Sequence, residues 1–228
     1  MISNTILFFF ATQISYFSII GFGSLLRKKS VENIWLDYFI NFFIGLILLN
    51  LLGQILYYLS LNSEFLNLFI IIVGFYFFLA KCDKNKLSRV ILLNFIFFSG
   101  ILISKLHEDW SYHFNFIEQI TTNSPIIGLG NVDDIHILSA SFFSFVQKIF
   151  YLPLFEFKFI LIPVYLVYLN ILIFLIQNVL INSKKLSQIF IIILAILVVK
   201  LARISEFGYD YLSNLMLLKI FILYLIND

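Results

Sequence analysis

The side chains with the most chemical capacity lie close together in one polar stretch, residues 105–136, between apolar runs. It contains Glu108 and Asp109, followed by Tyr112 and His113. On a helix that begins at Asp109, with 100° per residue, Asp109 and His113 fall on the apolar side, four residues apart. Burying a carboxylate and an imidazole costs free energy unless polar partners satisfy them, so we expect such partners near these two residues. Asp109 could serve as a general base or metal ligand, with His113 tuning it or binding phosphate.

A purely structural interpretation of these residues is also open. Asp109 could cap the first turn of the helix, and His113 could satisfy it locally. Glu108 suits a helix start for the same electrostatic reason. The helix pattern by itself favours the cap.

The end of the stretch offers one candidate for cation binding. Gly128-Leu129-Gly130-Asn131 predicts a tight turn that returns the chain to the membrane. Asp133, Asp134 and His136 follow, and they could bind a divalent cation, the only cofactor that the sequence suggests. An exposed acidic loop explains them as well.

A second polar island separates two later apolar runs. It contains Arg203, Glu206 and Asp210. Arginine binds phosphate in a fixed fork geometry, so Arg203 is a candidate phosphate contact. An arginine at this place is also a common anchor at the membrane edge. Both interpretations remain open.

The composition shows what must position these residues. Of 228 residues, 61% are hydrophobic and 12% are charged, whereas soluble domains are about 45–50% apolar and about 25% charged. A water-soluble fold of this size cannot bury so much apolar surface, so the chain is expected to lie in a membrane. The net charge of +2, with no continuous basic face, argues against a nucleic-acid partner. Cys82 is the single cysteine, which excludes an internal disulfide.

The apolar residues fall into blocks typical of membrane-spanning helices. The blocks are residues 5–26, 38–61, 65–80, 90–104, 137–154, 157–181, 188–199 and 212–226. We therefore predict an all-α fold: a polytopic transmembrane helical bundle of about seven or eight helices, forming a single integral membrane domain over residues 1–228. The last block has about 15 residues, which is short for a span, so we expect a C-terminal truncation.

Basic loops predict the orientation of the bundle. Residues 27–29 and 81–89 are rich in Lys and Arg and favour the cytoplasm. The N-terminus and the acidic loop 105–136 are then outside. If the block 137–154 crosses fully, Lys184 and Lys185 emerge outside, against this preference. If it is re-entrant or interfacial, they are cytoplasmic and the loop 200–210 shares the outer face with Asp109. Both options remain open.

Two stretches resemble a known group of proteins. Asp109-Trp110-Ser111-Tyr112-His113, then Gly128-Leu129-Gly130-Asn131, then Ser139 and Ser141, is similar to a pattern Asp-x-x-Tyr-His, Gly-Leu-Gly-Asn, Ser. That pattern occurs in bacterial polytopic membrane proteins that resemble the GT-C glycosyltransferases. Arg203-Ile204-Ser205 with Asp210 resembles a second stretch of the group. The resemblance extends from about Val90 to the C-terminus, and departs from the group at Asp133 and Ile135, where members tend to have His and Arg.

The resemblance implies a GT-C-like fold in a bacterial inner membrane, with a large outer loop that carries an interfacial helix. It implies a sugar donor on a polyprenyl phosphate, and a product in the cell envelope. Carried over, Asp109 is the general base, His113 lies in the donor site and Arg203 contacts phosphate. Glu108, Tyr112 and Asp210 join them as substrate-binding candidates. An inactive membrane protein fragment and a polysaccharide or lipid transporter are the alternatives; transporters favour broken helices and paired repeats, and no repeat is visible.

Overall fold

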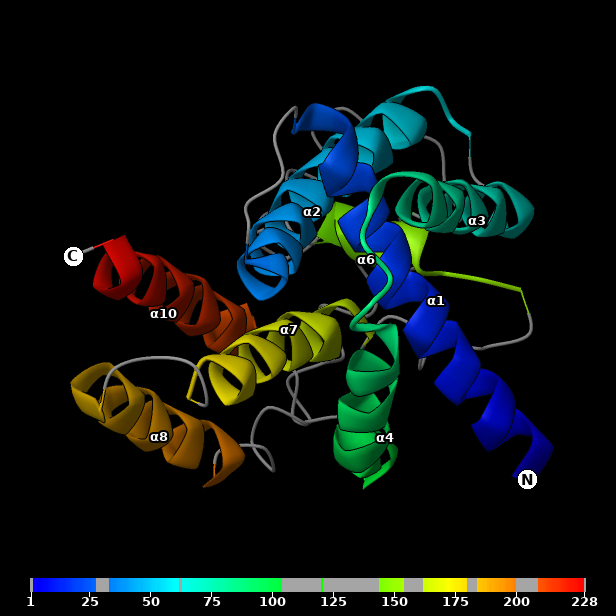
Figure 1. The fold of residues 1–228 in the computed structure, drawn as a ribbon. Helices are drawn as coiled ribbons and strands as arrows, with labels where there is room; N and C mark the ends of the chain where they lie inside the picture. Colours follow the sequence, from blue (N-terminus) through cyan, green and yellow to red (C-terminus); the bar gives the residue numbers. More distant parts are fainter. Residues whose placement is uncertain are drawn as a thin grey trace. The chain divides into compact units, whose positions relative to one another are not determined.

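The chain folds into helices at nearly all of the predicted apolar blocks. The computed structural model describes residues 2–27, 33–61, 63–103, 120, 144–153, 162–179, 184–199 and 209–227, and in these residues it contains eight helices and no strand (Figure 1). The helices are α1 (Ile2–Leu26), α2 (Ile34–Tyr58), α3 (Glu64–Lys81), α4 (Leu87–Ile103), α6 (Ser144–Ile149), α7 (Ile162–Val179), α8 (Lys184–Val199) and α10 (Tyr209–Asn227). The prediction of an all-α fold is confirmed.

Four of these helices are long and apolar enough to cross a membrane. They are Thr5–Leu26 within α1, all of α2, all of α3 and all of α7. Shorter apolar segments lie in α4, α8 and α10. The block 137–154 differs from the others, because its described part contains only the six-residue helix α6, followed by a turn. Six residues rise about 9 Å, far less than the hydrocarbon core of about 30 Å, so α6 alone does not span.

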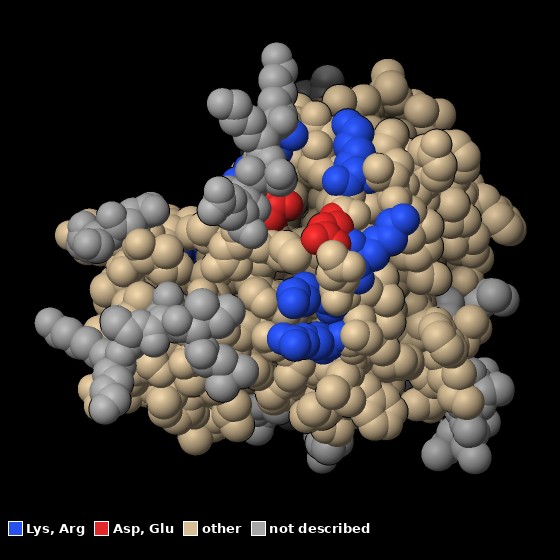
Figure 2. All heavy atoms as spheres, in the orientation of Figure 1, with Lys and Arg blue, Asp and Glu red and all other residues tan. Residues whose placement is uncertain are grey.

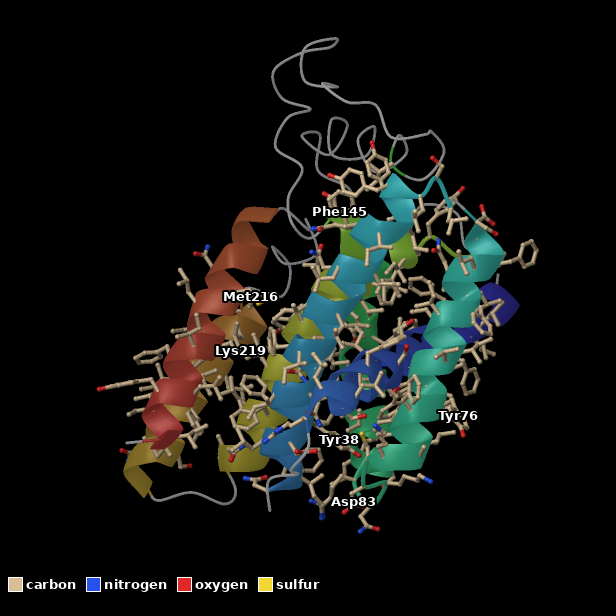
Figure 3. The ribbon with its side chains drawn as sticks, turned by 90° about the horizontal axis from the view of Figure 1, so that it is seen from above. Tyr38, Tyr76, Asp83, Phe145, Met216 and Lys219 are labelled. Carbon is tan, nitrogen blue, oxygen red and sulfur yellow. The ribbon has the colours of Figure 1, made fainter. Side chains whose placement is uncertain are left out.

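The surface agrees with a membrane location. Most of the face in Figure 2 consists of residues without charge. On α3 a stripe of large apolar side chains is exposed, at Phe65, Phe69, Ile72 and Tyr76, and Tyr76 points outward from the helix (Figure 3). Side chains of this kind suit contact with lipid. The side of the membrane on which each loop lies stays a prediction.

The chain groups into two compact units. The first comprises Met1–Lys29, Ile40–Cys82 and Glu108–Pro163; the second comprises Ser30–Phe39, Asp83–His107 and Val164–Asp228. The first unit thus contains α1, most of α2, α3 and α6. The second contains the first turns of α2 together with α4, α7, α8 and α10. The prediction of one membrane domain for residues 1–228 stays a prediction.

Glycines let the helices of the first unit pack backbone against backbone. A Cβ atom on Gly45 would lie 1.8 Å from the carbonyl oxygen of Ile19, and one on Gly23 would lie 1.8 Å from that of Asn41. These contacts join α1 to α2. A Cβ atom on Gly21 would lie 1.9 Å from the Gly74 carbonyl oxygen, which joins α1 to α3. Small residues at such crossings are typical of helices that associate in lipid.

Polar groups and rings hold the second unit together. The Asn33 side chain caps α2 by accepting from the backbone N–H of Trp35 at 3.0 Å. The Tyr38 hydroxyl donates to the carbonyl oxygen of Asp83, and the two residues lie side by side in Figure 3. On α7, the Tyr165 hydroxyl donates to Asn94 Oδ1 of α4 at 2.6 Å.

Two further contacts extend the second unit to α8 and α10. The Tyr168 hydroxyl of α7 donates to the carbonyl oxygen of Leu197 in α8 at 3.0 Å. The Phe39 ring stacks on Phe174 of α7 with ring centroids 4.2 Å apart. The ammonium of Lys219, on α10, lies 5.6 Å from the centroid of the same Phe39 ring. The residues before Ile40 therefore belong to the second unit although α2 continues past them.

Candidate functional site

Most of the predicted site lies outside the described residues. This holds for Glu108, Asp109, Tyr112, His113 and Arg203, and for the cation candidates Asp133, Asp134 and His136. Asp210 lies in the first turn of α10, whose backbone is described there. The structure therefore neither brings these residues together nor separates them, and their roles stay predictions.

The described part of the chain contains a different polar site, centred on α6. The side-chain amide of Asn67, in the first turn of α3, donates to the carbonyl oxygens of Lys148 at 3.0 Å and Tyr151 at 2.9 Å. These carbonyls lie at and just beyond the C-terminus of α6, where the last carbonyl groups lack the N–H partners that the helix interior provides. The Lys148 carbonyl also accepts from the Tyr151 backbone N–H at 3.1 Å. The Asn67 amide adds one donor to each carbonyl and fixes the end of α6 against α3.

α2 holds the other side of α6 through a glycine and an aromatic pair. A Cβ atom on Gly53 would lie 2.3 Å from the carbonyl oxygen of Phe145, so only glycine permits this approach. One turn further along α2, the Tyr57 ring lies 5.8 Å from the Phe145 ring, centroid to centroid. Phe145 lies beside the last turns of α2 in Figure 3. α6 is therefore clamped between α2 and α3 within the first unit.

The clamp buries a lysine. The Lys148 side chain is 1% exposed, and among the described residues its Nζ has no hydrogen-bond partner. Nζ lies 5.6 Å from the centroid of the Tyr57 ring, a cation–π contact that replaces only part of the lost hydration. Burial lowers the pKa of the Lys148 ammonium from 10.5 to about 8. The group is therefore still mostly protonated at neutral pH.

Further unpaired polar atoms lie in the first unit. Asn50 is fully buried, and neither atom of its amide has a hydrogen-bond partner in the described residues. Asn50, Gly53 and Tyr57 are spaced three and four residues apart, so they share one stripe of α2. Gly53 and Tyr57 on that stripe contact α6. The helix face that meets Lys148 is thus polar as well as aromatic.

Sequence reasoning did not find the Lys148 site. A lysine in an apolar block commonly extends its ammonium to the membrane edge, as long basic side chains do. The structure instead places the ammonium inside the protein. The available signal was the polar pair Gln147-Lys148 in an otherwise apolar block, together with Ser144 one turn earlier, which puts polar side chains on one face of α6.

Neither a metal cluster nor a known relative identifies the site. In the part of the chain that the structure describes, no group of three His, Cys, Asp or Glu residues could hold a metal ion. Cys82 is a buried cysteine at the C-cap of α3. No family model, curated protein or solved structure matches this chain.

Proposed function

We propose that this protein is a membrane glycosyltransferase that takes its sugar from a polyprenyl-phosphate donor during cell-envelope assembly. The observation that carries the proposal is the sequence pattern Asp109-x-x-Tyr112-His113 with Gly128-Leu129-Gly130-Asn131, in an acidic stretch between apolar helices. The helical architecture supports it, because α1, α2, α3 and α7 are long and apolar enough to cross a bilayer. A donor with a polyprenyl tail dissolves only in such a membrane.

In this proposal Asp109 acts as the general base. It accepts the proton of an acceptor hydroxyl as that oxygen forms a bond to the anomeric carbon of the donor sugar. The bond from the anomeric carbon to the phosphate oxygen breaks, and polyprenyl phosphate leaves with the electron pair. His113 and Arg203 would hold the phosphate through charge-assisted hydrogen bonds. Glu108, Tyr112 and Asp210 would bind the sugar or the acceptor.

A lipid or polysaccharide transporter is the second candidate function. The observation that favours it is the buried Lys148 on the short helix α6. Ionisable groups buried at membrane depth commonly mark a transport path, often beside interrupted helices. A transporter would move the lipid-linked sugar without breaking the bond between sugar and phosphate, which separates the two candidates chemically.

The test is release of polyprenyl phosphate from a donor in proteoliposomes that contain the full chain and a lipid extract of native membranes as acceptor. Polyprenyl-phosphate glucose and polyprenyl-phosphate mannose serve as separate donors. We expect release with at least one of them, and a loss of about 100-fold or more in Asp109→Asn, the size expected for a general base. Asp83→Asn is the matched control, because Asp83 is an exposed carboxylate in the turn after α3.

A labelling experiment checks the geometry that the proposal requires. Single cysteines are placed at Ser111 and Ser205 in a Cys82→Ser background, and intact cells are treated with a membrane-impermeant thiol reagent. Labelling of both positions from outside is the expected result, because Asp109 and Arg203 must share a face. Labelling of Ser111 alone contradicts the composite site. Equal release by wild type and Asp109→Asn contradicts Asp109 as the general base. No release by wild type with either donor contradicts the enzyme, and transbilayer movement of intact donor then favours the transporter.

A further inference from the structure

Lys148 is held at the ends of two helices that are long and apolar enough to cross a membrane. α2 has 25 residues, which at about 1.5 Å per residue make it about 37 Å long, longer than the hydrocarbon core of about 30 Å. Tyr57 belongs to the last turn of α2, and Asn67 belongs to the first turn of α3. Both residues contact α6, and the end of a helix that crosses a bilayer is expected at the level of the lipid headgroups.

In the described part of the chain, the ammonium has no counter-ion. Its Nζ has no hydrogen-bond partner among the described residues, and the Tyr57 ring is its one described electrostatic contact. An isolated buried charge is costly, and a partner of opposite charge removes that cost. Three separate contacts, from Asn67, Gly53 and Tyr57, hold α6 so that the amine cannot simply turn away.

We propose that Lys148 binds the phosphate of an anionic membrane lipid at the end of α2 and α3. A phosphate oxygen accepts a charge-assisted hydrogen bond from Nζ, and the lipid tails run along the apolar surface of the helices. The inference is independent of sugar transfer, because it needs none of the residues proposed for catalysis.

Tyr57 controls access to the ammonium in this site. Its ring contacts Nζ on one side and is itself only partly buried. A rotation of this side chain would expose Nζ to a headgroup, at the expense of the cation–π contact. The neighbouring Tyr58 is 70% exposed and its ring lies 5.6 Å from that of Tyr57, centroid to centroid, so it offers a matched aromatic position away from Nζ.

The test measures how probe lipids shift the thermal unfolding midpoint of the purified full chain in detergent. The probes are dioctanoyl phosphatidylglycerol, dioctanoyl phosphatidylcholine and inorganic phosphate. We expect saturable stabilisation by phosphatidylglycerol alone. Lys148→Met should weaken its apparent affinity about tenfold or more, as for loss of a charge-assisted hydrogen bond. If Lys148→Met does not fold, Lys148→Gln is measured in its place. The control is Lys219→Met, which removes the lysine of α10 and should have the same apparent affinity for phosphatidylglycerol as wild type.

The aromatic pair separates a binding role from a structural one. Tyr57→Ala should increase the apparent affinity for phosphatidylglycerol, because it removes both the cation–π contact to the Lys148 ammonium and the ring that shields this ammonium from a headgroup. Tyr58→Ala should leave the affinity unchanged. A structural lysine would give no such increase. The proposal is overturned if Lys148→Met responds as wild type does, if phosphatidylcholine stabilises equally, or if inorganic phosphate alone reproduces the effect, which would assign the site to free phosphate.

Discussion

Two buried asparagines of the first unit provide a direct test of how α6 is held. Asn67 is 4% exposed and donates two hydrogen bonds to α6, whereas Asn50 is fully buried and makes none to a described residue. Leucine has the branching of asparagine without its polar atoms, so Asn→Leu removes the amide and adds the same extra volume at each of the two buried positions. The changes in the free energy of unfolding that the two substitutions cause should therefore differ in sign.

The magnitudes follow from the hydrogen bonds. Asn67→Leu removes two hydrogen bonds: the Lys148 carbonyl keeps the Tyr151 backbone N–H as a donor, whereas the Tyr151 carbonyl loses the Asn67 amide. Hydrogen bonds between helices in a membrane contribute about 0.6 kcal/mol each, and an unsatisfied buried group adds to the loss, so we expect destabilisation of about 1–3 kcal/mol. Asn50→Leu removes an amide that is buried without partners, which should be neutral or stabilising by about 1 kcal/mol.

The assay is reversible unfolding of the purified protein in mixed micelles, by titration with sodium dodecyl sulfate and detection of helix content by circular dichroism. The free energy of unfolding of Asn67→Leu should fall below that of wild type, and that of Asn50→Leu should not. Equal destabilisation by both substitutions would mean that burial alone, and not the two hydrogen bonds to α6, decides the effect. An unchanged Asn67→Leu would refute the role of the Asn67 amide.

Two smaller predictions concern the backbone. Gly45→Ala should lower the free energy of unfolding by about 1–3 kcal/mol, because the new Cβ would lie 1.8 Å from the Ile19 carbonyl oxygen and α1 must move away from α2. The control is Leu51→Ala, at an exposed position of the same helix. An equal loss of stability in Leu51→Ala would contradict the reasoning. Ser60 has a φ of 58°, in the left-handed region. Ser60→Gly should raise the thermal unfolding midpoint, because glycine removes about 1 kcal/mol of backbone strain, and Ser60→Val should lower the midpoint. The reverse order would show that the turn does not hold this conformation.

The sequence predicted the helices well where apolar runs are long. The blocks at residues 5–26, 65–80 and 188–199 lie within α1, α3 and α8, because a continuous apolar run in lipid satisfies its backbone hydrogen bonds within itself only as a helix. The start of α2 was misplaced at residue 38, since the helix begins at Ile34 and includes the charged Asp37. The Asn33 cap explains this, because a capped first turn can contain polar residues.

The polar site at α6 could not be predicted in the same way. Hydrophobic periodicity shows which residues are apolar, but it does not show that Asn67 donates to residues 81 and 84 positions later. The close approach at Gly53 is equally invisible, since a glycine in an apolar run has many explanations. The burial of Lys148 depends on both contacts. For the loop that contains Asp109, the prediction rests on the residues and the resemblance alone.

The long separation between Asn67 and its acceptors has a consequence for biogenesis. α1, α2 and α3 leave the ribosome first, and their glycine contacts can form as soon as they enter the membrane. The Asn67 amide can form its two hydrogen bonds only after Lys148 and Tyr151 have been synthesised. Until then the Asn67 amide, at the end of a partly synthesised helical hairpin, lacks these hydrogen-bond acceptors. Partly synthesised chains therefore differ chemically from the finished one at this position, and quality-control proteases that recognise unpaired polar groups could distinguish them there.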